Sequence, residues 1–192
     1  MNKNDLRVVK TKNGIHQALL HILQNKPLMQ IKVTELCKAA NINRGTFYFH
    51  YEEVGDVFAE LYEEIMIDLK ESYDEPYKRT NHLSVETLDP NTICIFHHIK
   101  KYEDFYKIVL SENVSMTYYY MLFDAVRSIC IDDNRSKAYD PLQGYLYSYT
   151  TNAILGLIIE WYRRDFQEST EEMNIKLVKI INLFHEKGEA KK

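Results

Sequence analysis

The sequence predicts an all-α fold, and three observations support this prediction. The 192 residues include only 6 glycines and 4 prolines, which favours long helices joined by few turns. Apolar residues recur every three or four positions in most segments, as on the buried face of a helix. The longest apolar run, residues 153–159, is far too short to span a bilayer. Because the N-terminus also lacks an apolar signal core, we expect a cytoplasmic protein that does not enter a membrane.

The first 52 residues are expected to form a small three-helix domain. Apolar spacing predicts a first helix from about residue 7 to residue 24. Residues 32–49 predict a helix, a tight turn and a second short helix, because Asn41 tolerates the left-handed conformation that ends a helix. Asn43 is a good N-cap for the second helix. The expected core of this domain is Ile15, Leu19, Leu23, Ile31, Val33, Leu36, Ile42, Phe47 and Tyr51.

The short second helix carries side chains that suit the major groove of DNA. An arginine can donate two hydrogen bonds to a guanine edge, and threonine or tyrosine can donate to phosphate or contact a thymine methyl group. A glycine lets the backbone approach the DNA closely. We therefore expect a helix-turn-helix whose DNA-contacting residues are Thr34, Asn43, Arg44, Gly45, Thr46, Tyr48 and Phe49.

The charge distribution agrees with one DNA-binding end. Residues 1–52 contain eight Lys or Arg against three acidic residues, a balance of +5, so the remaining residues must carry −9 to give the net charge of −4. A basic segment before an acidic body is expected where only one end of the protein meets a polyanion. The alternative is a chance cluster of cations on a solvated face.

The same segment resembles a known family. NRGTFYFHYEE, residues 43–53, resembles the recognition-helix signature of TetR-type transcriptional regulators, and IKVTELCKAANI, residues 31–42, resembles the part that precedes it. The resemblance covers residues 31–53, about an eighth of the chain. It departs from the family at Lys32, where an N-capping Thr or Ser is usual, and at Asn41, where Gly is common. VGDVF, residues 54–58, replaces the usual K-E-x-L, which removes a lysine that could contact phosphate.

Residues 53–192 are expected to form a helical body for dimerisation and effector binding. A fourth helix is predicted at 54–73, followed by a polar loop at 74–90 that contains two prolines. Ser169-Thr170-Glu171-Glu172 is a capping signature for the last helix. The remaining helices are predicted at 91–101, 103–110, 114–131, 141–166 and 170–187.

A second resemblance covers the body. Residues 153–173 are similar to the end of a TetR subgroup that includes activators related to the dihydroxyacetone kinase regulators, and IKKYEDFYKIVLSEN, residues 99–113, also resembles that subgroup. The family pairs its last two helices with those of a second copy. The resemblance therefore implies a homodimer on a double-stranded DNA operator, with one recognition helix in each of two major grooves. The expected interface residues are Ile154, Leu157, Ile158, Trp161, Leu177, Ile180, Ile181 and Phe184.

An effector is expected to bind within the body, between the fourth helix and the helices at 91–131 and 141–166. Apolar and aromatic side chains would line this site, with tyrosine hydroxyls as polar anchors, so a neutral or weakly charged small molecule is favoured. The candidate wall residues are Phe96, Tyr102, Phe105, Tyr106, Met121 and Phe123. These residues would also make a closed core, in which case the body would respond to a protein co-regulator.

The sequence offers no catalytic or metal-binding pattern. It contains no GxSxG, HExxH or phosphate-binding loop, and its three cysteines form no CxxC. His97 and His98 are neighbours on a predicted helix and face about 100° apart, which is poor geometry for one metal ion. We expect no enzyme activity and no cofactor, although a helical enzyme is a rival hypothesis. The favoured function is a TetR-type repressor controlled by a small ligand; the alternative is a regulator without a small-molecule pocket, acting with a protein partner as an activator.

Overall fold

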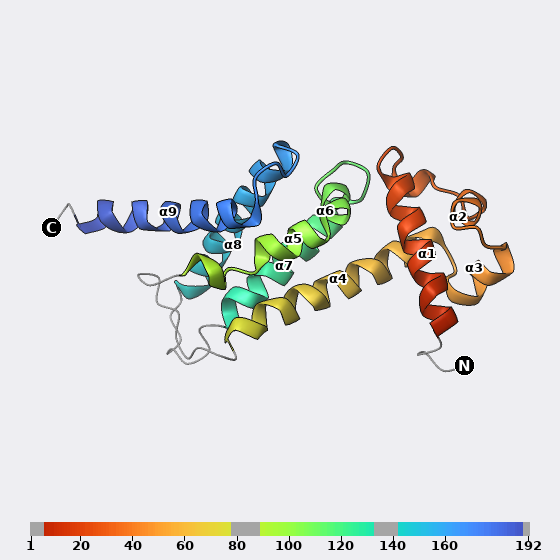
Figure 1. The fold of residues 1–192 in the computed structure, drawn as a ribbon, viewed down its shortest axis with the longest axis horizontal. Helices are drawn as coiled ribbons and strands as arrows, with labels where there is room; N and C mark the ends of the chain where they lie inside the picture. Colours follow the sequence, from red (N-terminus) through yellow and green to blue (C-terminus); the bar gives the residue numbers. More distant parts are fainter. Residues whose placement is uncertain (1–5, 78–88, 133–141, 190–192) are drawn as a thin grey trace. The chain divides into compact units, whose positions relative to one another are not determined.

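The computed structural model describes residues 6–77, 89–132 and 142–189, and these residues form nine α-helices and two short 3-10 helices (Figure 1). The predicted all-α fold is confirmed. The chain divides into two compact units. The first contains residues 1–66 and 104–119, and the second contains residues 67–103 and 120–192. The helix-turn-helix therefore belongs to a unit that extends beyond residue 52.

The first unit contains the three expected N-terminal helices. They are α1 (Leu6–Leu23), α2 (Val33–Ala39) and α3 (Arg44–His50), with the 3-10 helix η1 (Leu28–Gln30) before α2. We call residues 6–51 the head. Seven of the nine predicted core residues are buried, whereas Val33 and Ile42 are half-buried. The amphipathic spacing of the apolar residues thus located the core of the head correctly.

Two asparagines shape the turn between α2 and α3 as predicted. Asn41 has a φ of 53°, in the left-handed region where Asn is one of the few tolerated residues. Asn43 Oδ1 accepts hydrogen bonds from the Thr46 backbone N–H at 2.8 Å and from the Thr46 hydroxyl at 3.1 Å. This N-cap satisfies a backbone donor that the helix itself leaves unpaired. Lys32 supplies no side-chain cap to α2, in agreement with its departure from the family pattern.

The long helix α4 (Val54–Tyr77) is tied to the head by a polar cluster. Glu60 on α4 accepts a hydrogen bond from the Lys12 ammonium and another from the Tyr51 hydroxyl. The buried His16 belongs to the same cluster, because its Nε2 lies 3.2 Å from the Tyr51 hydroxyl oxygen. Helix α4 extends four residues beyond its predicted end. The helix ends at Tyr77, one residue after Pro76, a residue type that interrupts helical hydrogen bonding.

The remaining helices follow in the predicted order. They are η3 (Pro90–Thr92), α5 (Ile95–Lys101), α6 (Glu103–Val109), α7 (Met116–Asp132), α8 (Gln143–Arg163) and α9 (Thr170–Glu189). The helix expected to begin at residue 91 begins at Ile95. A local turn precedes it, in which the carbonyl of Asp89 accepts the Thr92 backbone N–H at 2.9 Å and its hydroxyl at 2.7 Å. Pro141, predicted to open a helix, lies outside the described residues.

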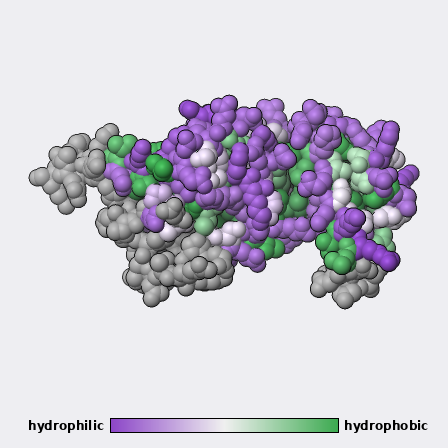
Figure 2. All heavy atoms as spheres, viewed as in Figure 1, coloured by the Kyte–Doolittle hydropathy of each residue, from purple (hydrophilic) through white to green (hydrophobic). Residues whose placement is uncertain are grey.

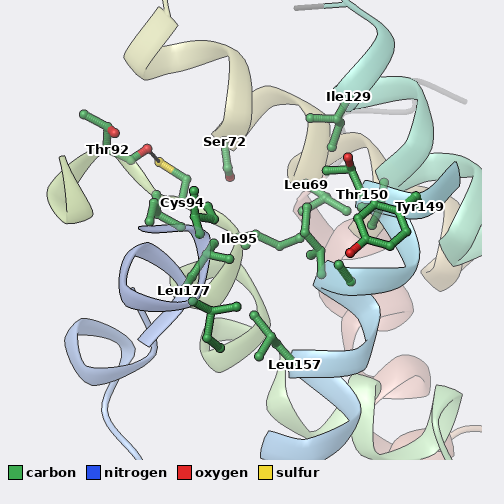
Figure 3. Close-up of a pocket in the computed structure, with 16 residues that line it drawn as sticks. Leu69, Ser72, Thr92, Cys94, Ile95, Ile129, Tyr149, Thr150, Leu157 and Leu177 are labelled. Carbon is green, nitrogen blue, oxygen red and sulfur yellow. Dashed lines mark hydrogen bonds between the residues drawn. The ribbon is translucent and has the colours of Figure 1, made fainter. Parts of the chain in front are cut away.

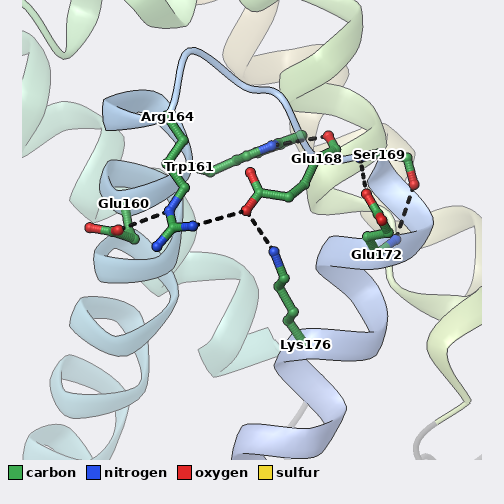
Figure 4. A network of polar contacts seen from close by, with 7 residues as sticks. All are labelled: Glu160, Trp161, Arg164, Glu168, Ser169, Glu172 and Lys176. Carbon is green, nitrogen blue, oxygen red and sulfur yellow. Dashed lines mark hydrogen bonds and ion pairs between the residues drawn. The ribbon is translucent and has the colours of Figure 1, made fainter.

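The turn between α8 and α9 is held by several polar contacts (Figure 4). The Trp161 indole N–H donates to the backbone oxygen of Glu168 at 3.1 Å. Ser169 and Glu172 form the predicted capping box: the Ser169 N–H donates to the Glu172 carboxylate at 2.8 Å, and the Glu172 N–H donates to the Ser169 hydroxyl at 3.2 Å. Lys176 pairs with the Glu168 carboxylate at 2.6 Å. This turn fixes where α9 begins relative to α8 within the second unit.

The surface drawn in Figure 2 is predominantly hydrophilic, with hydrophobic residues gathered in separate small patches. Among the described residues, no helix is both long and apolar enough to cross a lipid bilayer.

Candidate nucleic-acid interface and effector cavity

Helix α3 presents polar and aromatic side chains on its exposed side. Phe47 is fully buried and anchors the helix to the core of the head. Tyr48 and Phe49 are 51% and 62% exposed, which is unusual for large aromatic residues. Arg44 and Gly45 are exposed as well, and Thr46 is half-buried because its hydroxyl serves the N-cap. The helix therefore offers a ready contact surface.

Arg44 and Tyr48 form a pair on this surface. They are four residues apart and so share one side of the helix. Arg44 Nη2 donates a hydrogen bond to the Tyr48 hydroxyl at 3.3 Å, and the guanidinium carbon lies 5.7 Å from the centre of the tyrosine ring. The hydrogen bond to Tyr48 raises the pKa of Arg44, so the guanidinium stays charged.

An open groove separates α3 from the start of α1. Arg7, Val8 and Thr11 line it from α1, and the α3 segment lines it with Asn43, Gly45, Thr46, Phe49 and His50. A Cβ added at Gly45 would lie 3.2 Å from Asn43 Oδ1. A larger residue at this position would therefore press on the atom that caps α3. Burial lowers the pKa of His50, which keeps the imidazole neutral near physiological pH.

All seven residues predicted to contact DNA are accessible, and none is buried. Thr34 is exposed on α2, one residue before Glu35, whose carboxylate pairs with Lys26 at 2.6 Å. The structure thus brings Asn43, Arg44, Gly45, Thr46, Tyr48 and Phe49 together on one short helix and its cap, with Thr34 on the preceding helix.

The chain has a buried valine where the family has a lysine, and two glutamates directly before it. Val54, at the position of that lysine, is only 7% exposed and belongs to the core. Glu52 and Glu53 are exposed between α3 and α4, and their backbone N–H groups donate to Asp56 Oδ2 at 3.0 Å and 2.8 Å. Asp56 therefore caps α4, while the two glutamates add negative charge beside the contact surface of α3.

The second unit contains an apolar cavity of about 370 Å³ (Figure 3). Helices α4, α5, α7, α8 and α9 contribute its walls, together with the segment before α5. No charged side chain is among the described residues that line it. Its polar atoms come from Ser72, Thr92, Cys94, Tyr149 and Thr150. The apolar lining residues are Leu69, Ile93, Ile95, Val126, Ile129, Ala153, Ile154, Leu157, Leu177, Ile180 and Ile181.

The six residues proposed as effector walls lie elsewhere. Phe96 is fully buried against Trp161, with ring centres 5.8 Å apart. Phe105 and Tyr106 are buried in the first unit, where Phe105 stacks on Phe58 with ring centres 5.9 Å apart. Tyr102 and Phe123 are half-buried, and Met121 is exposed. None of the six lines the cavity of the second unit.

The residues predicted for the dimer interface have a different arrangement from the one expected. Five of them line the cavity of the second unit: Ile154, Leu157, Leu177, Ile180 and Ile181. Ile158 and Trp161 are each 1% exposed and pack inside the second unit, so these two side chains do not form an outer surface. The side chain of Phe184 lies outside the described residues. The large apolar residues that α8 and its N-cap expose are Leu142, Tyr145, Leu146 and Tyr149.

Within the described residues, no group of three or more His, Cys, Asp or Glu side chains is placed to hold a metal ion. Cys37 is buried in the head and Cys94 is half-buried beside the cavity. Burial raises the pKa of both thiols, which disfavours the reactive thiolate form.

Comparisons with known proteins place this geometry in context. A family model described as "Transcriptional regulator C-terminal region" matches residues 86–183, about half of the chain. The fold is similar to that of the dihydroxyacetone kinase operon activator DhaS, with a TM-score of 0.63 and 16% identity, covering 90% of this chain and 94% of that chain. A TetR transcriptional regulator from Streptococcus agalactiae 2603V gives a TM-score of 0.61 and 19% identity, covering 91% and 95%.

A third similar structure was solved with a ligand. The transcriptional regulator FadR from Bacillus subtilis, in complex with stearoyl-CoA, gives a TM-score of 0.64 and 16% identity, covering 88% of this chain and 96% of that chain. At identities this low, the three likenesses show a shared fold.

Proposed function

Because the chain belongs to the TetR family of transcriptional regulators, we propose that it is a sequence-specific DNA-binding dimer whose recognition helix is α3. The observation that carries this proposal is the exposed side of α3, where a charged arginine and two large aromatic residues face solvent on a helix anchored by a buried phenylalanine. Side chains of this kind meet the major groove in helix-turn-helix proteins. The positive net charge of residues 1–52 also supports this end of the chain as the part that contacts DNA.

Each residue of the α3 surface has a proposed role. Arg44 donates to a guanine edge, and Thr46 and Tyr48 contact phosphate or a thymine methyl group. Gly45 lets the helix approach the DNA without disturbing the Asn43 cap. Asn43, Thr34 and the backbone around Phe49 contact phosphates, which set the register of the helix but carry no sequence information.

Selection of bound duplexes from a random DNA pool tests this proposal. A two-fold dimer should enrich two inverted half-sites whose centres are about one helical turn, or a multiple of it, apart. If the recovered DNA has no consensus and the amount bound depends only on the salt concentration, sequence-specific binding is contradicted.

We also propose that α8 and α9 form the contact between the two copies. The support is the apolar stripe that Leu142, Tyr145, Leu146 and Tyr149 leave exposed, together with Ile175 and Leu183 on α9. Light scattering of the unmodified protein should give the mass of a dimer. Leu146→Glu should lower that mass toward a monomer, whereas Leu6→Glu, which charges an exposed leucine of α1, should not. A monomeric unmodified protein at micromolar concentration would contradict the proposal.

We propose further that the protein is a repressor released by a small, uncharged and largely apolar ligand in the cavity of the second unit. The cavity volume lies within the range of ligand sites, and the described lining carries no charge. The similar FadR structure was solved with stearoyl-CoA, a ligand with a long apolar chain, which supports the proposal of an apolar ligand here. These points favour ligand control over the alternative of an activator that depends on a protein co-regulator.

A thermal-shift series tests ligand control. Long-chain alcohols and amides should raise the melting temperature, because a ligand that binds only the native state stabilises it, and should weaken DNA binding. Ala153→Phe, which fills the cavity from α8, should abolish the shift and leave DNA binding intact. Flat shifts for all neutral ligands would favour the co-regulator alternative, and lower expression of a reporter when the protein is present would separate repression from activation.

A further inference from the structure

The segment Ser111–Asn113, at the end of the motif IKKYEDFYKIVLSEN, makes a specific contact with the head. This segment connects α6 to α7 and belongs to the same compact unit as the head. The family resemblance singles out its Ser and Asn without giving them a role. In the structure, Asn113 lies against the turn between α1 and η1.

Asn113 makes two hydrogen bonds to this turn. Its side-chain Nδ2 donates to the backbone oxygen of Leu23 at 2.8 Å, and its own backbone oxygen accepts from the N–H of Leu28 at 2.8 Å. Leu23 is the last residue of α1 and Leu28 is the first residue of η1. Carbonyls at helix ends and N–H groups at helix starts lack intrahelical partners. One residue therefore satisfies an unpaired acceptor and an unpaired donor on either side of the turn.

Ser111 holds Asn113 in place. Its hydroxyl donates to the backbone oxygen of Ile108 at 2.8 Å and accepts from the N–H of Asn113 at 3.1 Å. The orientation of the Asn113 amide follows from its partner, because a backbone oxygen can only accept and must therefore face the NH₂ group. The Ser-x-Asn spacing thus preforms the contact at the end of α6. We call Ser111 and Asn113, with their hydrogen bonds to the turn, the clasp.

The turn that the clasp holds leads directly into the helix-turn-helix. Leu23 and Leu28 are buried in the core of the head, where Leu36 of α2 is also buried. Lys26, within the turn, pairs with Glu35 of α2 at 2.6 Å. Contacts therefore run continuously from the α6–α7 connection through the turn to α2.

We propose that Asn113 is a positioning residue for DNA binding, which fixes the orientation of the head against the α6–α7 connection. This inference rests on the proposed function as a DNA-binding dimer. Asn113 touches no DNA; it acts through the turn. Two heads must meet two half-sites at a fixed spacing. A head that lacks the Asn113 hydrogen bonds can still bind one half-site. Its binding to the full site is weaker, because the loosened head must first be ordered in the orientation that the spacing requires.

Affinities for two duplexes test this role in the full-length protein. One duplex carries the selected inverted repeat and the other carries a single half-site. Asn113→Ala should weaken binding to the inverted repeat about five- to tenfold, the worth of one hydrogen bond, and leave half-site binding within about twofold. Asn113→Asp keeps the size of the side chain but turns an acceptor toward the Leu23 oxygen, and should have at least the same effect. Glu112→Ala, at the exposed neighbour, is the matched control and should change neither affinity.

Hydrogen exchange provides a direct readout of the clasp. The amide proton of Leu28 should exchange faster in Asn113→Ala, whereas those in the middle of α1 and α2 should keep their protection. Equal loss of affinity for both duplexes, unchanged affinity for both, or variants that no longer fold would each overturn a positioning role. If the unmodified protein selects no consensus DNA, the proposed function itself fails, and this outcome is distinguishable from a failure of the clasp.

Discussion

Arg44 and Tyr48 lie one helical turn apart on the exposed side of α3, and Arg44 Nη2 donates a hydrogen bond to the Tyr48 hydroxyl at 3.3 Å. The tyrosine ring also lies within reach of the guanidinium for a cation–π contact. The pair reduces the number of conformations that the long arginine side chain samples before it meets DNA. Because the side chain then loses less conformational entropy on binding, a larger share of the interaction energy with DNA appears as affinity.

Replacement of Arg44 tests its role as a base reader. Arg44→Ala should weaken binding to the selected duplex about ten- to hundredfold and relax selectivity at one base pair of each half-site, the cost of losing a bidentate contact to guanine. Fluorescence anisotropy with duplexes varied at single positions measures both effects. Lys179→Ala, which removes one cation from the exposed side of α9, should leave them unchanged. Unaltered affinity and selectivity in Arg44→Ala would assign Arg44 to a solvated surface.

Tyr48→Phe removes only the hydroxyl from the same surface. Because this hydroxyl accepts from Arg44 and is free to donate to a phosphate, its loss should weaken specific binding about two- to fivefold. The melting temperature should stay unchanged, since Tyr48 is exposed and contributes little to the core. An effect as large as that of Arg44→Ala would indicate that Tyr48, rather than Arg44, is the principal base reader.

The acidic residues before α4 are expected to oppose DNA binding. Glu52→Lys replaces a repelling charge with a lysine at the exposed edge of the α3 surface, and should raise affinity for any duplex. The slope of log affinity against log salt should steepen by about 1, as for one added phosphate contact. Glu63→Lys makes the same charge change on an exposed face of α4 and should leave the slope unaltered. Equal effects of both substitutions would indicate general attraction instead of a contact at residue 52.

The buried His16 gives the head a pH dependence. Burial lowers its pKa below the ordinary value, although the carboxylates of Glu64 and Glu60 act in the opposite direction. The folded head therefore keeps the imidazole neutral, whereas an unfolded chain takes up a proton near pH 6.5. Since the unfolded state then binds more protons, stability falls as pH drops below about 6.5.

Thermal melts at pH 7.5 and 5.5 check this dependence. From pH 7.5 to pH 5.5, the melting temperature of the unmodified protein should fall further than that of His16→Gln. The glutamine amide keeps a polar partner for Tyr51 but does not titrate. The interval avoids Glu60: burial raises its pKa, but hydrogen bonds from Lys12 and Tyr51 outweigh this and hold it below the ordinary value. The contribution of Glu60 is therefore lost only at lower pH. Equal pH dependence in both proteins would contradict the assignment to His16.

Features set by neighbouring residues could be predicted from the sequence. The Asn41 turn, the Asn43 cap and the capping box of Ser169 and Glu172 each depend on residues within a few positions, and all three are present. Most of the head core also follows, because amphipathic spacing identifies the buried side of each helix.

Features set by contacts distant in the sequence could not be predicted. Apolar spacing on α8 and α9 marks an apolar side but not what that side faces, so the spacing could not show that Leu177 and Ile181 line a cavity. Phe96 is an aromatic residue of the kind that lines ligand cavities, but its ring packs against Trp161. The clasp joins Asn113 to Leu23, and the polar cluster joins His16 to Tyr51; no local pattern pairs these residues.

The central claim is that α3 reads a DNA sequence, and a competition titration tests it most directly. The protein is bound to the labelled duplex obtained by selection, and unlabelled selected or scrambled duplexes of equal length and composition compete at one fixed salt concentration near physiological strength. The proposed function predicts that the selected duplex competes at least about 10³-fold better than the scrambled one. Equal competition by the two duplexes would mean that binding depends on charge alone, and would contradict the assignment of α3 as a recognition helix.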